Sequence, residues 1–557
     1  MKLAALGKKM EQNENMPEGG DLRDKHDKLQ EKIHKALRDR QVKLEAKEVA
    51  HVSQLYADGE MRAFHHWESK VTSGGKGKST IKLIQGKDGM LLTDPKDILN
   101  CTYEYYKDLK QDDPEKLSQN PEHWKGKFKG EQKDCPLKGI NDPLIWDLVL
   151  LAIRHMMVGT APGHNDIPVM FKAMLKEECT EALETDPGEN IYVALPAPDL
   201  PKEPLTEMGR ALWRIIKAIW DLGYQPDTWS RVTDMSMFKV GDPMDPKNYR
   251  GISLICVAMK IVTVMLAMRL SSVCEMEKVF VKEQGGFRSE EEAIAQFIVM
   301  VEIIRRRHLD GKKTFIVSID FMKAFDKVMH EALFEKLDAM GIRGQILDLI
   351  KNIYCTLKAC ICVGNDTSEY YDMLRGTCQG CPLSPILFLL FINDFLEYLP
   401  EGVSVPGMAK KEKCPGLLFA GDMASLADLV EMAHKVLEGV TKWSREWQMP
   451  MGAPKSNVML VNGTDKEQEA LKNENFSVDG RKIEVTRSYK YLGIVIMDKL
   501  GDVEQTNEMN HAETLASRVK QVVNIRRPFL KDPRFLIHIK MAVIASKIMS
   551  VGTYDGE

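Results

Sequence analysis

The sequence predicts a mixed α/β (α+β) fold, and a strand followed by a helix carries that prediction. Residues 314–328 read TFIVSIDFMKAFDKV, in which apolar β-formers alternate up to Asp320. A helical-looking run, residues 329–340, follows a second carboxylate, Asp326. A carboxylate at a strand end lies on the rim of a sheet, where Mg²⁺ finds oxygen ligands. An Asp that caps a helix gives the same pattern, so this stretch leaves both interpretations open.

Two later segments favour the first interpretation. Residues 375–399 read RGTCQGCPLSPILFLLFINDFLEYL, a Gly/Pro-rich loop that leads into an apolar helix. Residues 416–428 read GLLFAGDMASLAD, two apolar strands around an acidic turn. The order DFMKAFD, GTCQGCPLSP, FAGD resembles the palm of reverse transcriptases, and is similar to their non-LTR (LINE-type) retrotransposon branch. The resemblance implies a right-hand polymerase fold with helical fingers, an antiparallel palm sheet and a helical thumb.

The resemblance also implies domains and an activity. Residues 1–138 would be a charged helical or linker region, 139–485 the fingers and palm, and 486–557 a truncated thumb, without an endonuclease domain. The implied activity is RNA-templated DNA synthesis, in which a primer 3′-hydroxyl attacks the α-phosphorus of a dNTP with two Mg²⁺ or Mn²⁺ ions. The implied partners are an RNA template and a DNA primer.

Composition is ordinary for a soluble protein of several domains. The 557 residues are 44% apolar and 28% charged, and the net charge of -4 predicts that any nucleic-acid surface is local. The 11 cysteines lack framework spacing and follow no signal peptide, which predicts free thiols in a reducing, intracellular compartment. The resemblance implies a nuclear or cytoplasmic ribonucleoprotein. Residues 252–270 contain Lys260 and Arg269, so we expect a core helix and no membrane association.

Two weaker motifs are disfavoured. Residues 73–80 read SGGKGKST, but Thr72 replaces the first Gly of a phosphate loop and no strand precedes it. The pairs Cys360/Cys362 and Cys378/Cys381 lack a second Cys/His pair at zinc-finger spacing. We therefore expect a flexible basic turn and free thiols at these positions.

Residues 236–254 predict a β-hairpin whose strand tips bring Lys239 and Arg250 together. Two fixed cations suit a triphosphate, although hairpin charges are also often simply solvated. The resemblance favours the first interpretation. It further implies that Phe325 rejects a ribose 2′-hydroxyl and that Gln379 and Gly380 line the nucleotide and template.

Three segments carry predicted contacts to nucleic acid or pyrophosphate. The EQGGFR turn is similar to a family turn along the template and supplies Gln284, Phe287 and Arg288. The basic run from residue 518 to 547 suits a thumb that follows a nucleic-acid backbone, with candidates Arg526, Arg527 and Lys531. Lys455, in PKSNVMLV, matches the family's lysine near the pyrophosphate leaving group.

One departure from the family affects the metal ligands, for which we predict Asp320 and Asp422. The family's turn reads Phe/Tyr-Ala-Asp-Asp, and Gly421 replaces the first acid, the one that ligates both metals together with the strand-end Asp. We expect Asp422 to point to the other side, because one residue along a strand reverses the side-chain direction. Smaller departures are Gly452 for the usual Asn and Cys378 for a basic residue.

These departures predict weak or absent synthesis. The main alternative is a catalytically inactive relic that binds RNA and DNA. A group II intron-type maturase is a third interpretation, which the Lys239–Arg250 hairpin and the QGCPLSP loop disfavour.

Overall fold

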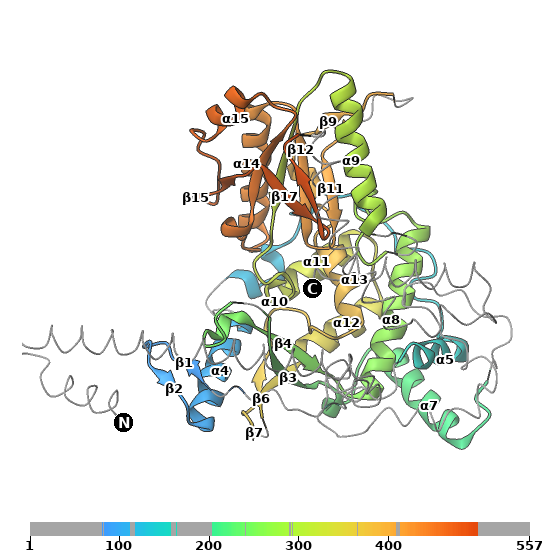
Figure 1. Ribbon diagram of the computed structural model, residues 1–557. Helices are drawn as coiled ribbons and strands as arrows, with labels where there is room; N and C mark the ends of the chain where they lie inside the picture. Colours follow the sequence, from blue (N-terminus) through green and yellow to red (C-terminus); the bar gives the residue numbers. More distant parts are fainter. Residues whose placement is uncertain are drawn as a thin grey trace, which may run out of the picture. The chain divides into compact units, whose positions relative to one another are not determined.

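The protein is described here from a computed structural model (Figure 1). The structure describes residues 81, 83–111, 117–156, 163, 203–239, 241–288, 291, 293–364, 366–407 and 413–499. The predicted basic turn at 73–80 and the thumb residues Arg526, Arg527 and Lys531 lie outside these ranges.

Five strands form the sheet that carries the predicted motifs, which we call the palm sheet. Their order is β11 (Gly416–Phe419), β12 (Asp422–Ala427), β5 (Thr314–Ile319), β13 (Asn457–Val461) and β16 (Glu484–Val485). All neighbours pair antiparallel except β13 and β16, which are parallel. The antiparallel palm sheet is therefore confirmed apart from this edge strand.

Both faces of the palm sheet are covered, which explains why β5 is buried along its whole length. Val317 belongs to the main core on one face, where α14 (Val430–Glu446) packs. Ile316 belongs to a smaller core on the other face, with α9 (Ala293–Leu309) and the hairpin β17 (Ser488–Tyr491)–β18 (Ile494–Met497). Alternate residues of one strand thus enter two different cores.

A second sheet holds the predicted Lys239–Arg250 hairpin (Figure 1). Its strands are β4 (Tyr249–Leu254), β3 (Arg231–Phe238), β6 (Lys358–Val363) and β7 (Asp366–Thr367), and β8 (Tyr371–Asp372) also pairs with β6. Helix α4 (Pro95–Lys110) packs on β6. The mixed fold expected from the sequence is thus built on two sheets with helices between and around them.

The remaining helices are α5 (Trp146–Arg154), α7 (Glu207–Leu222), α8 (Val257–Met276), α10 (Ala324–Lys327), α11 (His330–Ala339), α12 (Gln345–Cys355), α13 (Leu383–Phe391) and α15 (Asp465–Leu471). Short 3-10 turns are η1 (Leu117–Gln119), η2 (Pro121–His123), η4 (Asp227–Trp229), η5 (Pro246–Asn248), η6 (Phe395–Tyr398) and η7 (Ala453–Lys455). Two-residue strands are β1 (Ile84–Gln85), β2 (Leu91–Leu92), β9 (Val403–Ser404), β10 (Lys413–Cys414), β14 (Ser477–Val478) and β15 (Arg481–Lys482).

Helix α8 is the predicted core helix. Among the described residues it is the one helix long and apolar enough to cross a membrane, and 78% of its most apolar window is buried inside the protein. Its Arg269 donates to the backbone carbonyls of Asp142 and Pro143 and lies 4.7 Å from the Trp220 ring. One of the two cations that argued against a membrane span, Arg269, therefore has partners within the protein.

A buried ion pair joins α11 to the segment before η6. Lys336 Nζ lies 2.5 Å from Asp394 Oδ1, and both side chains are fully buried. Lys336 also donates to the Phe391 carbonyl at 2.7 Å and lies 3.7 Å from the Trp447 ring. Trp443 donates to the same Asp394 oxygen at 3.0 Å. Removing one partner would leave the other charge buried and uncompensated.

We therefore expect Lys336→Met to lower the free energy of unfolding by about 3–5 kcal/mol. Adding Asp394→Asn removes the stranded charge, so the double variant should recover most of that loss. Urea denaturation followed by Trp fluorescence measures both. A double variant that is no more stable than Lys336→Met would show that lost packing, and not the stranded carboxylate, sets the cost.

Candidate active site

Asp320 follows the last residue of β5, with its side chain about one-third exposed. Its backbone N–H donates to Ser456 Oγ at 3.2 Å, and its carbonyl accepts from the Gly452 N–H at 2.8 Å. Lys455 Nζ lies 3.9 Å from Asp320 Oδ2. Burial raises the pKa of Asp320, while Lys455 and Lys239 act to lower it. Two cations that the sequence predicted for this site thus act on the carboxylate, and Lys455 is in contact range.

Asp422 begins β12, and its side chain follows the face of the palm sheet that bears Ala424 and Leu426. Met423 pairs with Ile319, so Asp422 comes opposite Asp320 if the ladder is extended by one residue. Burial raises the pKa of Tyr489, and both Asp422 and Asp320 raise it further. The two predicted metal ligands therefore both act on one phenol of the β17–β18 hairpin.

Gly421 lies in the two-residue turn between β11 and β12. A Cβ placed there would meet ring carbons of Phe388 and Phe321 at 3.6–3.7 Å, which is ordinary van der Waals contact. Unlike its neighbour Ala420, Gly421 does not have a positive φ. An Asp at this position would therefore be tolerated without backbone strain, and its side chain would start toward Phe321, the residue after Asp320.

The turn is held by the EQGGFR segment. Gln284 Oε1 accepts from the Ala420 N–H at 2.8 Å and from the Gly286 N–H at 2.8 Å. Ala420 has φ +52°, an unusual value for a residue with a Cβ. A Cβ on Gly286 would come within 2.1 Å of the Ala420 nitrogen, so only glycine allows this approach. The structure places Gln284 on the acidic turn itself.

Arg288 and Phe287 are engaged inside the protein. Arg288 makes a bidentate ion pair with Glu275, at 2.8 Å and 2.7 Å, and donates to the Gln284 carbonyl at 2.9 Å. Phe287 is partly buried against the main core. The predicted contact of these two side chains with a template remains a prediction. Within the protein, their contacts support the turn that carries Gln284.

The predicted hairpin forms, with Met237 opposite Arg250 and the Lys239 N–H bonded to the Asn248 carbonyl at 2.9 Å. Lys239 directly follows β3, and if the strand is extended by one residue it lies on the same face of the hairpin as Met237 and Arg250. The charge of Lys239 acts to lower the pKa of Asp320, at the end of the palm strand β5.

The GTCQGCPLSP loop packs against the segment after β5. The Phe325 carbonyl accepts from the Thr377 N–H at 2.7 Å, and the Phe325 ring stacks on Phe388 with centroids 4.9 Å apart. Gln379 is half-buried and Gly380 is exposed. The structure thus brings Phe325, Gln379 and Gly380 to one region, as the sequence predicted.

Sequence reasoning missed three charged residues beside this loop: Lys110, Asp234 and Lys323. Lys110 follows Ile98, Thr102 and Tyr106 at four-residue spacing on the buried stripe of α4, so a lysine at a core position was a readable signal. Lys323 has φ +50° and lies 4.8 Å from the Tyr105 ring. Nothing in the local sequence predicts the positive φ of Lys323.

The carboxylates present fit a hard cation only in part. Mg²⁺ usually takes one or two carboxylates together with substrate phosphates, and Asp320 and Asp422 are two such carboxylates. No group of three or more His, Cys, Asp or Glu side chains suited to a metal occurs in the part of the chain that the structure describes. The side chain missing at Gly421 would be the third carboxylate of this region.

Comparisons with known proteins show what the chain is similar to. Residues 239–496 match the family model described as "Reverse transcriptase (RNA-dependent DNA polymerase)". The chain is 26% identical over 275 residues to a retrovirus-related Pol polyprotein from a type-1 retrotransposable element R2 of Popillia japonica, covering 49% of this chain and 38% of that protein. It is 25% identical over 326 residues to the RNA-directed DNA polymerase from mobile element jockey of Drosophila melanogaster, covering 57% and 34%.

The chain therefore matches 38% and 34% of the length of these two relatives. Among solved structures, an apo telomerase from Candida tropicalis, truncated from its C-terminal domain, aligns with a TM-score of 0.34 at 11% identity. That alignment covers 52% of this chain and 59% of the telomerase chain.

The contact between Lys455 and Asp320 predicts a pH-dependent metal affinity. A carboxylate binds a metal when ionised, and loss of the Lys455 charge raises the pKa of Asp320 further above its usual range. In Lys455→Gln the ratio of Mn²⁺ affinity at pH 8 to that at pH 5 should therefore increase, as measured by isothermal titration calorimetry. Lys472→Gln, a surface change in a pair with Glu469, is the control. An unchanged ratio in Lys455→Gln would contradict the prediction.

Proposed function

Because residues 239–496 belong to the reverse transcriptase family of non-LTR (LINE-type) retrotransposons, we propose that this chain is an RNA-directed DNA polymerase whose synthesis is impaired by Gly421. The observation that supports the proposal most is the surroundings of Asp320. A strand-end carboxylate, a lysine 3.9 Å away and a second carboxylate on the neighbouring strand lie together on one rim of a right-hand polymerase palm.

The proposed partners are an RNA template, a DNA primer and dNTPs, within an intracellular ribonucleoprotein. Phosphoryl transfer needs the triphosphate held in place and its charge neutralised. Lys239 and Lys455, which both act on Asp320, suit this task on the triphosphate and on the pyrophosphate leaving group. Arg250, on the same hairpin face as Lys239, adds a bidentate donor.

Asp320 and Asp422 would hold Mg²⁺ or Mn²⁺. Bound there, the ions would stabilise charge on the attacking and leaving oxygens of an in-line displacement. The protein's own contribution is to position the groups: Phe325 packs beside the nucleotide's sugar, and Gln379 and Gly380 line the nucleotide and template. This assignment rests on their common position around the loop and the palm rim.

The proposed impairment follows from the turn. In a set of residues that act as a unit, losing one member can cost on the order of a thousandfold or more in rate. Asp422 supplies one carboxylate next to Asp320, but Gly421 supplies none. The alternative function, a relic that binds RNA and DNA without synthesis, is favoured by the same missing side chain.

Primer extension distinguishes these two functions. We expect the protein as given to extend an oligo-dT primer on poly-rA weakly or not at all, and Gly421→Asp to be about a thousandfold faster with Mg²⁺ or Mn²⁺. The reason is that Asp restores a ligand where a side chain meets only ordinary contacts.

Gly421→Asn is the matched control, since it adds a side chain of the same size without a charge, and it should stay inactive. Asp320→Ala in the Gly421→Asp background should abolish extension. Equal extension by the given protein and by Gly421→Asp would show that Asp422 suffices. Template binding without extension in every variant would favour the relic.

A further inference from the structure

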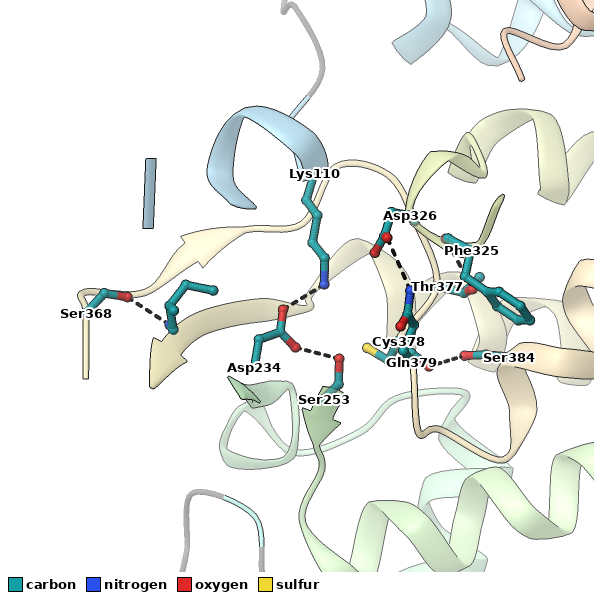
Figure 2. A network of polar contacts seen from close by, with 12 residues as sticks. Lys110, Asp234, Ser253, Phe325, Asp326, Ser368, Thr377, Cys378, Gln379 and Ser384 are labelled. Carbon is teal, nitrogen blue, oxygen red and sulfur yellow. Dashed lines mark hydrogen bonds and ion pairs between the residues drawn. The ribbon is translucent and has the colours of Figure 1, made fainter. Parts of the chain in front are cut away.

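The loop residue Gln379 is held from two sides. Its side-chain Nε2 donates to Asp326 Oδ2 at 3.2 Å, as Figure 2 shows. Its backbone carbonyl accepts from the Ser253 N–H at 2.7 Å. Asp326 comes from the segment after β5, whereas Ser253 comes from β4 of the second sheet. Helix α10 and the second sheet thus both fix the residue that we place against nucleotide and template.

Both sides lead to a buried carboxylate. Asp326 is 4% exposed, and its other oxygen, Oδ1, accepts no hydrogen bond from any residue that the structure describes. On the other side, Ser253 Oγ donates to Asp234 Oδ1 at 2.5 Å, and Asp234 is fully buried (Figure 2). Two carboxylates enclosed at this depth need a shared counter-ion, because an isolated buried charge is costly.

Lys110 is that counter-ion. Its Nζ lies 2.7 Å from Asp234 Oδ2, with both side chains fully buried. Burial raises the pKa of Asp326, and among the charges that oppose this rise Lys110 has the largest effect. Lys323 and Lys327 also oppose the rise, whereas Asp234 adds to it. Lys110 is the one of these lysines that is ion-paired to Asp234, and through Ser253 it is also linked to the backbone of Gln379.

We propose that Lys110 and Asp326 are positioning residues of the polymerase site, which act by holding the Gln379 side chain and its loop in place for the incoming nucleotide. The inference rests on the proposed function. It extends the site beyond residues 239–496, since Lys110, the last residue of α4, and Asp234, in β3, both precede the matched region.

A second buried pair separates positioning from stability. Lys336 and Asp394 are as deeply buried as Lys110 and Asp234. Their hydrogen bonds go to the Phe391 carbonyl and Trp443, and none goes to Gln379 or Ser253. Loss of either pair should destabilise the fold, but only loss of the first should change how the loop meets a nucleotide.

The test is a double-mutant cycle in the full chain carrying Gly421→Asp. Asp326→Leu keeps the Lys110–Asp234 pair and removes the acceptor of Gln379. We expect it to raise the KM for dTTP about tenfold or more, since a hydrogen bond to a charged group is worth about 1.5–3 kcal/mol. Gln379→Ala should raise the KM for dTTP by a similar factor. The KM of the double variant should be no higher than that of the more impaired single variant, because the two substitutions remove the same interaction.

Three further variants complete the test. Asp326→Asn keeps an acceptor oxygen for Gln379 Nε2 but no charge, so its KM should lie between those of the parent and of Asp326→Leu. Lys110→Met should raise KM as Asp326→Leu does. Lys336→Met should lower the melting temperature and leave the KM of the folded enzyme unchanged. If Lys110→Met does not fold, the Asp326 and Gln379 cycle decides alone.

A KM for dTTP that Asp326→Leu leaves unchanged would overturn the inference. So would effects of Asp326→Leu and Gln379→Ala that multiply, which would mean two independent roles. Failure of the proposed function can be told apart from failure of this inference. A Gly421→Asp parent that neither extends a primer nor binds dTTP would overturn the proposed function and the inference together. An active parent in which the effects of Asp326→Leu and Gln379→Ala on KM multiply would overturn only the roles of Lys110 and Asp326.

Discussion

The structure depends on the pairing of β5 with a neighbour on each side. β12 and β13 pair with overlapping residues of β5, on its two edges. Residues 423–427 of β12 lie opposite residues 319–315 of β5. Residues 457–461 of β13 lie opposite residues 318–314. This double pairing sets where Asp320 leaves the sheet. It also sets which groups surround it, since Asp422 begins β12 and Lys455 precedes β13.

Much of this arrangement could be predicted from the sequence, because the strands and turns that form it depend on residues that are adjacent in the chain. Alternating apolar residues before Asp320, the FAGD turn and the Lys239–Arg250 hairpin are each contiguous, and the structure forms all three. The amphipathic pattern of the sequence already starts at Asn141, but helix α5 begins only at Trp146. Pro143 disfavours helical backbone in the residue before it, and Asn141 instead bonds to Arg343 and Ile346.

Other features could not be predicted, because they depend on residues that are distant in the chain. Gln284 bonds to Ala420 of the acidic turn, and Lys110 pairs with Asp234 of the second sheet. Both are tertiary contacts that the spacing of residues in the sequence does not predict. The side on which Asp422 lies is a further case. The register places Asp422 opposite Asp320 when the ladder is extended by one residue, and its role as a metal ligand stays a prediction. The sequence could not show that Asp320 and Asp422 act on the same tyrosine, Tyr489.

The order of the palm strands along the chain has a consequence for how the site assembles. β5 is synthesised well before β12 and β13, and before the loop that carries Gln379. Pairings between segments so distant in sequence form slowly, because closing the intervening chain costs entropy before any contact rewards it. While the protein emerges from the ribosome, β5 therefore exposes two apolar faces and two unpaired edges until Val461 has been made. Such a strand can pair with other chains, so cotranslational chaperones would have most to protect at this stage.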